Sequence, residues 1–196
     1  MEIIKNIIRK EIQELVPYKV QNAEGYVKLD AMENPYLLSD SLQHELGKYL
    51  SKVKLNRYPI PSYTELKKII CRKMLVPKGF DVILGNGSDE LISIISVACA
   101  KKNAKVLSPV PCFVMYELCA KLSGLEFIGV PLKEDFSLDF QSFLNAIRKH
   151  KPSIIYLAYP NNPTGNLFYF DHIHRIINEV GDTGIVILDE AYQPFA

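Results

Sequence analysis

Asp189, Glu190, Ala191 and Tyr192 form the short stretch whose residue types and position are best suited to chemistry. They directly follow the apolar run 184–188, GIVIL. A carboxylate at the end of a buried strand is costly unless a cation pairs with it. Asp189 and Tyr192 are three residues apart, so both side chains can approach one ligand if the chain turns there. Taken alone, Asp189 as the N-cap of a following helix is the simpler interpretation.

Three further stretches follow strand-like runs. Residues 85–90, GNGSDE, precede an apolar helix pattern, so their backbone amides could bind an anion, although a turn with Ser88 as helix N-cap is the simpler interpretation. Residues 159–166, YPNNPTGN, have the composition of a turn that would direct an Asn amide toward the end of the sheet. Phe113 follows the strand-like run at residues 104–109. Together with the acid and the tyrosine of DEAY, these groups suit a flat, phosphorylated, cationic heterocycle.

Strand and helix patterns alternate along the chain, which predicts a mostly parallel sheet with helices on both faces. Strands are expected at residues 81–84, 104–109, 125–132, 153–160 and 184–188. Helices are expected over the first 15 residues and at 39–52, 63–75, 89–101, 111–124, 138–150 and 170–180. Ligands bind beyond the carboxyl ends of parallel strands, where the four stretches lie. We therefore expect a three-layer α/β/α fold with a site at this edge of the sheet.

Composition limits the classes of function. The net charge of the 196 residues is +1, which provides no strong field toward nucleic acid or an anionic membrane. No stretch is long and apolar enough to span a bilayer, and the N-terminus lacks the features of a signal peptide. None of the four cysteines forms a CxxC motif, so we expect free thiols in a reducing compartment, the cytoplasm. No grouping of residues is typical of a metal site.

The combination of motifs resembles the aminotransferases of pyridoxal 5′-phosphate (PLP) fold type I, class I/II, and among them most closely the histidinol-phosphate aminotransferase family. The stretches that carry the resemblance, in that family's order, are LVPY (15–18), VKLDAMENPY (27–36), NRYP (56–59), GNGSDELI (85–92), PCFVMYEL (111–118), YPNNPTGN (159–166) and VILDEAY (186–192). NNPTG with DEAY is typical of the broad superfamily, and the other motifs narrow it. The resemblance implies part of the PLP-binding large domain at residues 31–196, preceded by an N-terminal helix and arm at residues 1–30.

The resemblance implies roles for the residues around the cofactor ring. Asp189 matches the acid that pairs with the pyridine nitrogen and keeps it protonated. Asn162 and Tyr192 match the pair that hydrogen-bonds the 3′ oxygen of the ring. Phe113 matches the aromatic residue that stacks on the ring face. In this family the polar residues that Asp189, Asn162 and Tyr192 match take part in catalysis as well as in cofactor binding.

The resemblance also implies contacts outside the ring. Ser88, Asp89 and Glu90 lie where backbone amides hold the cofactor phosphate. Tyr58 matches the tyrosine that reaches the cofactor phosphate of the neighbouring subunit, which implies a homodimer with shared sites. Tyr18 is at the position expected to touch the substrate.

The implied activity is transamination between L-histidinol phosphate and 2-oxoglutarate in histidine biosynthesis. The lysine that bonds covalently to PLP follows DEAY in this family, whereas the last lysine here is Lys151. We therefore expect the chain to be the N-terminal part of the enzyme, without the small domain, and to be inactive in isolation. The alternatives are an enzyme similar to threonine-phosphate decarboxylase, an aromatic aminotransferase, or a non-catalytic truncated product that dimerises or binds.

Overall fold

The structure, a computed structural model, describes residues 6–16, 22–28, 33–58 and 63–196. The chain divides into two compact units, one comprising Met1–Leu15 with Leu84–Ala196 and the other comprising Val16–Ile83. The predicted boundary between residues 30 and 31 lies outside the described residues, as does Tyr18.

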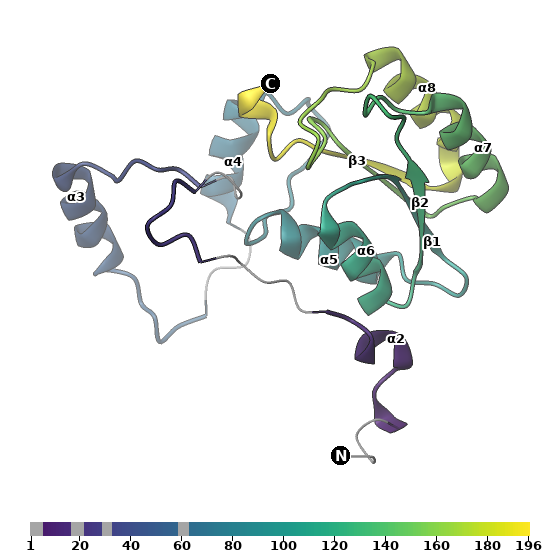
Figure 1. The fold of residues 1–196 in the computed structure, drawn as a ribbon. Coiled ribbons are helices and arrows are strands. Elements are labelled where there is room, and N and C mark those ends of the chain that lie inside the picture. Colours follow the sequence, from purple (N-terminus) through teal and green to yellow (C-terminus); the bar gives the residue numbers. More distant parts are fainter. Residues whose placement is uncertain (1–5, 17–21, 29–32, 59–62) are drawn as a thin grey trace. The chain divides into compact units, whose positions relative to one another are not determined.

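A four-stranded parallel sheet forms the centre of the first unit (Figure 1). Its strands are β1 (Lys105–Val110), β2 (Glu126–Pro131), β3 (Ile154–Ala158) and β4 (Ile185–Asp189). They lie in the order β2-β1-β3-β4. Four of the five predicted strands are therefore confirmed. The continuous apolar run of β3 is buried along its whole length, as expected for a central parallel strand. β4 lies at an edge, where Ile185 and Leu188 are 50% and 38% exposed.

Alternate side chains of each strand point to opposite faces of the sheet. On β3, Ile154 and Tyr156 pack in one apolar cluster, whereas Ile155 and Leu157 pack in another. The helices that contribute to the first cluster are α5 (Ser88–Ala98) and α6 (Val114–Leu122), and those that contribute to the second are α7 (Phe140–His150) and α8 (Phe170–Val180). The three-layer α/β/α arrangement predicted from the sequence is thus confirmed.

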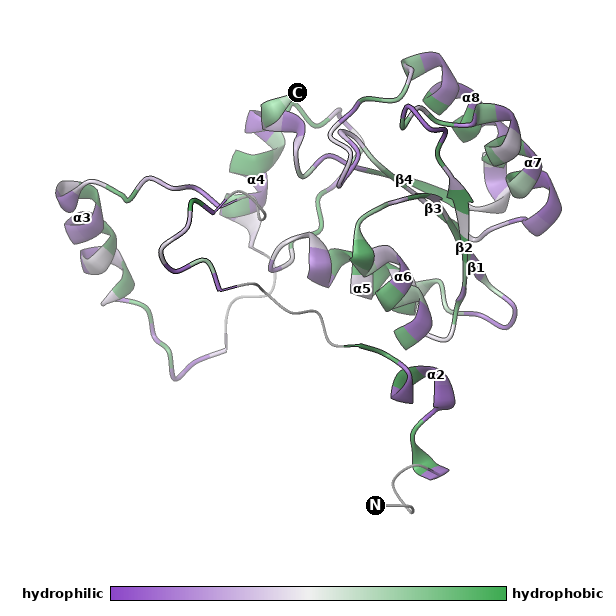
Figure 2. Cartoon of the chain, in the orientation of Figure 1, coloured by the Kyte–Doolittle hydropathy of each residue, from purple (hydrophilic) through white to green (hydrophobic). Residues whose placement is uncertain are grey.

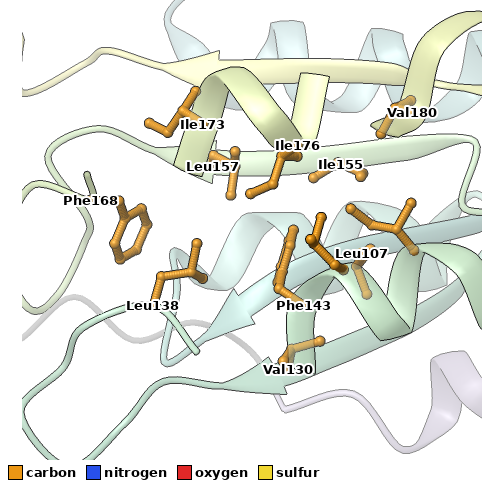
Figure 3. Close-up of a cluster of buried hydrophobic side chains, with 12 residues drawn as sticks. Leu107, Val130, Leu138, Phe143, Ile155, Leu157, Phe168, Ile173, Ile176 and Val180 are labelled. Carbon is orange, nitrogen blue, oxygen red and sulfur yellow. The ribbon is translucent and has the colours of Figure 1, made fainter. Parts of the chain in front are cut away.

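Figure 3 shows the cluster between the sheet and helices α7 and α8. Phe143 of α7 and Ile176 of α8 are fully buried there, beside Leu107 and Ile155 of the sheet. Removing such a side chain from water contributes about 1.5–3 kcal/mol. In Figure 2 the strands are mostly green, whereas α7 and α8 carry both hydrophobic and hydrophilic residues. Both helices therefore pack on the sheet through an apolar face.

Helix α7 begins with a side-chain cap. Asp139 precedes the first helical residue, and its carboxylate accepts hydrogen bonds from Ser142 N at 3.1 Å and Ser142 Oγ at 2.7 Å. These two bonds hold the pKa of Asp139 below its ordinary value. Because the lower pKa belongs to the folded state, the cap stabilises the fold at pH values above the pKa that the Asp139 carboxyl has in the unfolded chain, which is about 3.9. It loses this effect as the pH falls through the folded-state pKa.

Replacing Asp139 with alanine is expected to lower the free energy of unfolding by about 1 kcal/mol at pH 7, because the first turn of α7 loses its acceptor. The difference from the wild type should shrink below about pH 4, where the carboxylate becomes protonated. Urea unfolding followed by circular dichroism at pH 7 and pH 3 measures both values. Glu134→Ala, at an exposed acid nearby, is the control. A D139A variant as stable as the wild type at pH 7 would contradict the cap.

The second unit contains α3 (Asp40–Leu50) and α4 (Thr64–Lys73), which confirms the helices predicted there. Neither helix has a buried residue. Among the helices in the described ranges, none combines the length and the apolar character needed to cross a lipid bilayer.

The predicted strand at residues 81–84 is not formed. Ile83 is 76% exposed. Asp81 instead accepts hydrogen bonds from Lys67 Nζ at 3.3 Å and from the backbone amide of Val82. A strand needs a neighbour that pairs with its backbone groups, and no other part of the described chain forms a ladder with this segment.

The prediction of a helix over the first 15 residues is also wrong for the described part of that range. It is interrupted at Ile8 and Arg9, and α2 spans only Lys10–Gln13, without a buried residue. A helix this short is not stable without tertiary packing of an apolar face, and Ile7 is 78% exposed. The guanidinium of Arg9 donates a hydrogen bond to the Leu122 carbonyl, which connects this segment to α6.

Candidate functional site

Three of the predicted site stretches meet at the carboxyl edge of the sheet. The backbone amide of Tyr159 donates to the Asp189 carbonyl at 2.8 Å, which joins the ends of β3 and β4. The Asn161 side chain donates to the Pro111 carbonyl at 3.2 Å, which joins the loops after β3 and β1. The parallel topology therefore brings together stretches that are far apart in the sequence.

Asp189 ends β4 and is half-buried, with a neutral donor on each carboxylate oxygen. Its Oδ2 accepts a hydrogen bond from Tyr116 Oη at 2.7 Å, and its Oδ1 accepts one from the backbone amide of Ala191 at 3.1 Å. Within the described part of the chain, no basic side chain forms an ion pair with it. The interpretation of Asp189 as a helix N-cap is wrong, because Tyr192 holds that place before the short 3-10 helix η2 (Gln193–Phe195). A half-buried carboxylate with neutral partners attracts a cationic ligand.

Tyr116 lies on α6 and is fully buried beneath the edge of the sheet. Its ring stacks on the ring of Tyr156, with centroids 4.5 Å apart and an interplanar angle of 3°. The ring of Phe113 meets it edge-on at 5.8 Å and 88°. Burial raises the pKa of Tyr116 strongly, and the negative charge of Asp189 raises it further. The hydroxyl therefore stays protonated and remains a hydrogen-bond donor to Asp189.

Tyr156 connects this stack to α5. Its hydroxyl donates to the Ile92 carbonyl at 3.3 Å and lies 3.5 Å from Ser96 Oγ. Burial raises the pKa of Tyr156 as well. A continuous series of contacts thus runs from α5 through two tyrosines to the carboxylate of Asp189.

The start of α5 leaves its backbone amides without a side-chain cap. Gly87, with φ of +84°, occupies the N-cap position, and no side chain caps the helix. The interpretation of Ser88 as N-cap is therefore wrong, because Ser88 is the first helical residue. The Glu90 carboxylate accepts a hydrogen bond from a backbone amide of the preceding loop. The pKa of Cys119 is raised mainly by burial, and the negative charge of Asp89 raises it further. The amides of the first turn, rather than the acidic side chains, are the groups suited to bind an anion.

Asn162 and Tyr192, which were predicted to bind one ring oxygen, are both half-buried. Neither side chain forms a hydrogen bond with another described residue. The neighbouring Asn161 has a different role, because it is only 2% exposed and its Nδ2 donates to Thr164 Oγ1 at 2.7 Å as well as to Pro111. Asn161 therefore holds the loop, and Asn162 keeps its polar groups available for a ligand.

The two remaining predicted residues do not belong to the unit that contains this cluster. Tyr58 belongs to the unit Val16–Ile83 and is 100% exposed. Tyr18 lies outside the described residues. Their predicted contacts with a partner subunit and with substrate stay predictions.

Sequence reasoning missed Tyr116 and Asn161. The signal for Tyr116 was its position three residues after Phe113, the N-cap of α6, because this short spacing lets the two rings meet edge-on. The signal for Asn161 was weaker, because it stands beside a second asparagine and only burial distinguishes the two.

The chemistry of these groups fits the cofactor expected from the sequence. The carboxylate of Asp189 suits a protonated ring nitrogen. The polar groups of Asn162 and Tyr192, which have no hydrogen-bond partner among the described residues, suit a ring oxygen. The uncapped amides at Ser88 and its neighbours suit a phosphate. Phe113 is half-buried beside this group of residues and supplies an aromatic face.

The comparisons with known proteins agree with the motifs. The model of the family described as aminotransferase class I and II matches residues 24–196. Histidinol-phosphate aminotransferase 1 of Burkholderia lata is 54% identical over 192 residues, which cover 98% of this chain and 54% of that protein. Histidinol-phosphate aminotransferase 1 of Ralstonia nicotianae is 52% identical over 198 residues, which cover 100% of this chain and 53% of that protein.

Solved structures agree in fold. The crystal structure of histidinol-phosphate aminotransferase from Sinorhizobium meliloti, in complex with PLP, has a TM-score of 0.76 at 22% identity. The match covers 96% of this chain and 52% of that one. The chain thus spans about half the length of the curated relatives it matches.

Proposed function

Because the chain belongs to the family of class I and II aminotransferases, we propose that it carries the ring- and phosphate-binding groups of a PLP-dependent transaminase acting on L-histidinol phosphate and 2-oxoglutarate. The observation that carries this proposal is the half-buried carboxylate of Asp189, held by neutral donors at the carboxyl edge of the sheet. The names of the relatives that are 54% and 52% identical support L-histidinol phosphate as the amino donor.

Asp189 acts on the ring nitrogen of the cofactor. When bound, PLP supplies an electron-accepting ring and a carbonyl carbon that exchanges amino groups. The negative charge of Asp189 holds a proton on the ring nitrogen, because a nearby carboxylate favours the cationic form of a base. The hydrogen bonds from Tyr116 and Ala191 keep the carboxylate oxygens oriented while it does so.

The other groups orient the cofactor. Asn162 and Tyr192 bind the ring oxygen with polar groups that have no other partner among the described residues. Phe113 packs against one face of the ring. The amides at the start of α5 bind the phosphate, and the position of Gly87 leaves the N-cap place without a side chain.

The full exposure of Tyr58 supports a homodimer, in which this side chain reaches the cofactor phosphate of the neighbouring subunit. The four cysteines are free, which is consistent with a place in the reducing cytoplasm.

A chimera tests the proposed function. In it, this chain replaces the matching half of the Burkholderia lata enzyme, to which it is 54% identical. Glutamate formation from 2-oxoglutarate is measured with L-histidinol phosphate or L-phenylalanine as amino donor, and release of CO2 is measured with O-phospho-L-threonine. We expect glutamate to form most rapidly with L-histidinol phosphate.

Preference for L-phenylalanine would instead indicate an aromatic aminotransferase, and CO2 release would indicate a decarboxylase. A chimera that unfolds cooperatively but acts on none of the three compounds would contradict the proposal. The unmodified Burkholderia lata enzyme serves as the control for the assay.

A further inference from the structure

We propose that Tyr116 is a positioning residue that holds the Asp189 carboxylate in the orientation in which it receives the ring nitrogen of the cofactor. The inference rests on the proposed function, because it assigns a role to a residue beside that site. The two residues are 73 positions apart in the sequence and meet only through the packing of α6 on the sheet.

The hydrogen bond itself is short and well placed. Tyr116 Oη lies 2.7 Å from Asp189 Oδ2, within the range of a hydrogen bond between a hydroxyl and a charged acceptor. The other oxygen accepts from the Ala191 amide at 3.1 Å. With one donor on each oxygen, rotation of the carboxylate would break at least one bond. Each oxygen keeps lone-pair capacity for a further donor.

The packing around Tyr116 fixes the place of its hydroxyl. The side chain is fully buried, stacked on Tyr156 at 4.5 Å and met edge-on by Phe113 at 5.8 Å. A ring held on two sides by other rings has little freedom to move its hydroxyl group. The core beneath the sheet edge therefore determines where Asp189 points, as supporting groups do in preorganised sites.

A purely structural role is the alternative. A buried tyrosine hydroxyl needs a partner, and Asp189 supplies one, so loss of the hydroxyl would change stability without a specific effect on the ligand. The two roles differ in one measurable respect. If Tyr116 acts through Asp189, removing its hydroxyl should have little effect on ligand binding once the carboxylate has been replaced.

The experiment is a double-mutant cycle on the chain with 4′-deoxypyridoxine 5′-phosphate as the probe. This compound has the ring nitrogen, ring oxygen and phosphate of PLP but no aldehyde, so its binding requires no lysine. The variants are Tyr116→Phe, Asp189→Asn and the double variant. Tyr156→Phe is the matched control, because it removes another buried hydroxyl from the same stack, one that contacts Ile92 and Ser96 instead of Asp189.

We expect Tyr116→Phe to raise the Kd of the probe by about 10-fold in the wild-type background and by less than about 2-fold in the Asp189→Asn background. Tyr156→Phe should change the Kd by less than about 2-fold and equally in both backgrounds. Circular dichroism verifies that each variant is folded. If Tyr116→Phe does not fold, replacement of Tyr116 by 4-fluorophenylalanine fills the space of the hydroxyl without donating a hydrogen.

Equal losses from the Tyr116 variant in both backgrounds would overturn the positioning role while leaving the cofactor site intact. Wild-type affinity in the Tyr116 variant would do the same. A wild-type chain that folds but does not bind the probe would overturn the proposed cofactor site, and the role of Tyr116 with it.

Discussion

Asp189→Asn is expected to raise the Kd of 4′-deoxypyridoxine 5′-phosphate by about 100-fold, or about 2.7 kcal/mol. The substitution keeps the size of the side chain and an oxygen that can still accept the hydrogen bond from Tyr116. It removes the negative charge that is proposed to pair with the protonated ring nitrogen. In the chimera with the Burkholderia lata enzyme, the same substitution should abolish most of the transaminase activity while PLP still binds. Calorimetry of the chain and the glutamate assay of the chimera measure the two effects.

Glu190→Gln is the matched control, since it removes the same charge one residue further on, from an exposed side chain. It should change the affinity by less than about 2-fold, because exposed charges are screened by solvent. Similar losses in both variants would mean that the general negative charge of this segment, rather than the Asp189 carboxylate, attracts the ligand. Unchanged affinity in Asp189→Asn would contradict the proposed role outright.

Phe143→Ala is expected to lower the free energy of unfolding by about 3–5 kcal/mol. The side chain is fully buried in the cluster between α7 and the sheet, beside Leu107 and Ile155 (Figure 3). Its removal leaves a cavity that rigid neighbouring strands cannot fill. Because a domain of this kind is stabilised by about 5–15 kcal/mol in total, the variant should unfold at much lower urea concentration.

Phe170→Ala is the control for this prediction. Phe170 begins α8 and is 67% exposed, so its loss should cost less than about 1 kcal/mol. Phe143 packs on the face of the sheet opposite Tyr116. Below its unfolding transition the Phe143→Ala variant should therefore bind 4′-deoxypyridoxine 5′-phosphate normally. Equal losses of stability in the two variants would contradict the burial of Phe143 in the core.

Much of the fold could be predicted because its signals are local. The apolar run at 154–158 is buried along β3, and the helices after β1, β2 and β3 begin and end close to the predicted positions. Asp139 and Gly181 mark the start of α7 and the end of α8 through chemistry that involves only their immediate neighbours.

The failures have a common physical cause. Residues 81–84 have the composition of a strand, but a strand forms only where another segment pairs with its backbone, and none of the described residues does so. The isoleucines near the N-terminus have helical spacing, yet Ile7 remains exposed and the helix is interrupted after it. Composition and periodicity indicate which secondary structure a segment could form. They do not show whether another segment is present to pair or pack with it.

Sequence patterns are sufficient to identify the family, the order of strands and helices along the chain, and the polar residues at the strand ends. These depend on residue type and spacing over a few positions, as in DEAY and NNPTG. Only the tertiary structure shows that the side-chain donor to Asp189 is Tyr116, that Asn161 is fully buried and Asn162 only half-buried, and that Gly87 rather than Ser88 holds the N-cap of α5. The first two facts depend on which strands pair and which helix covers which face. The third depends on the backbone angles of one turn, and residue types do not specify these.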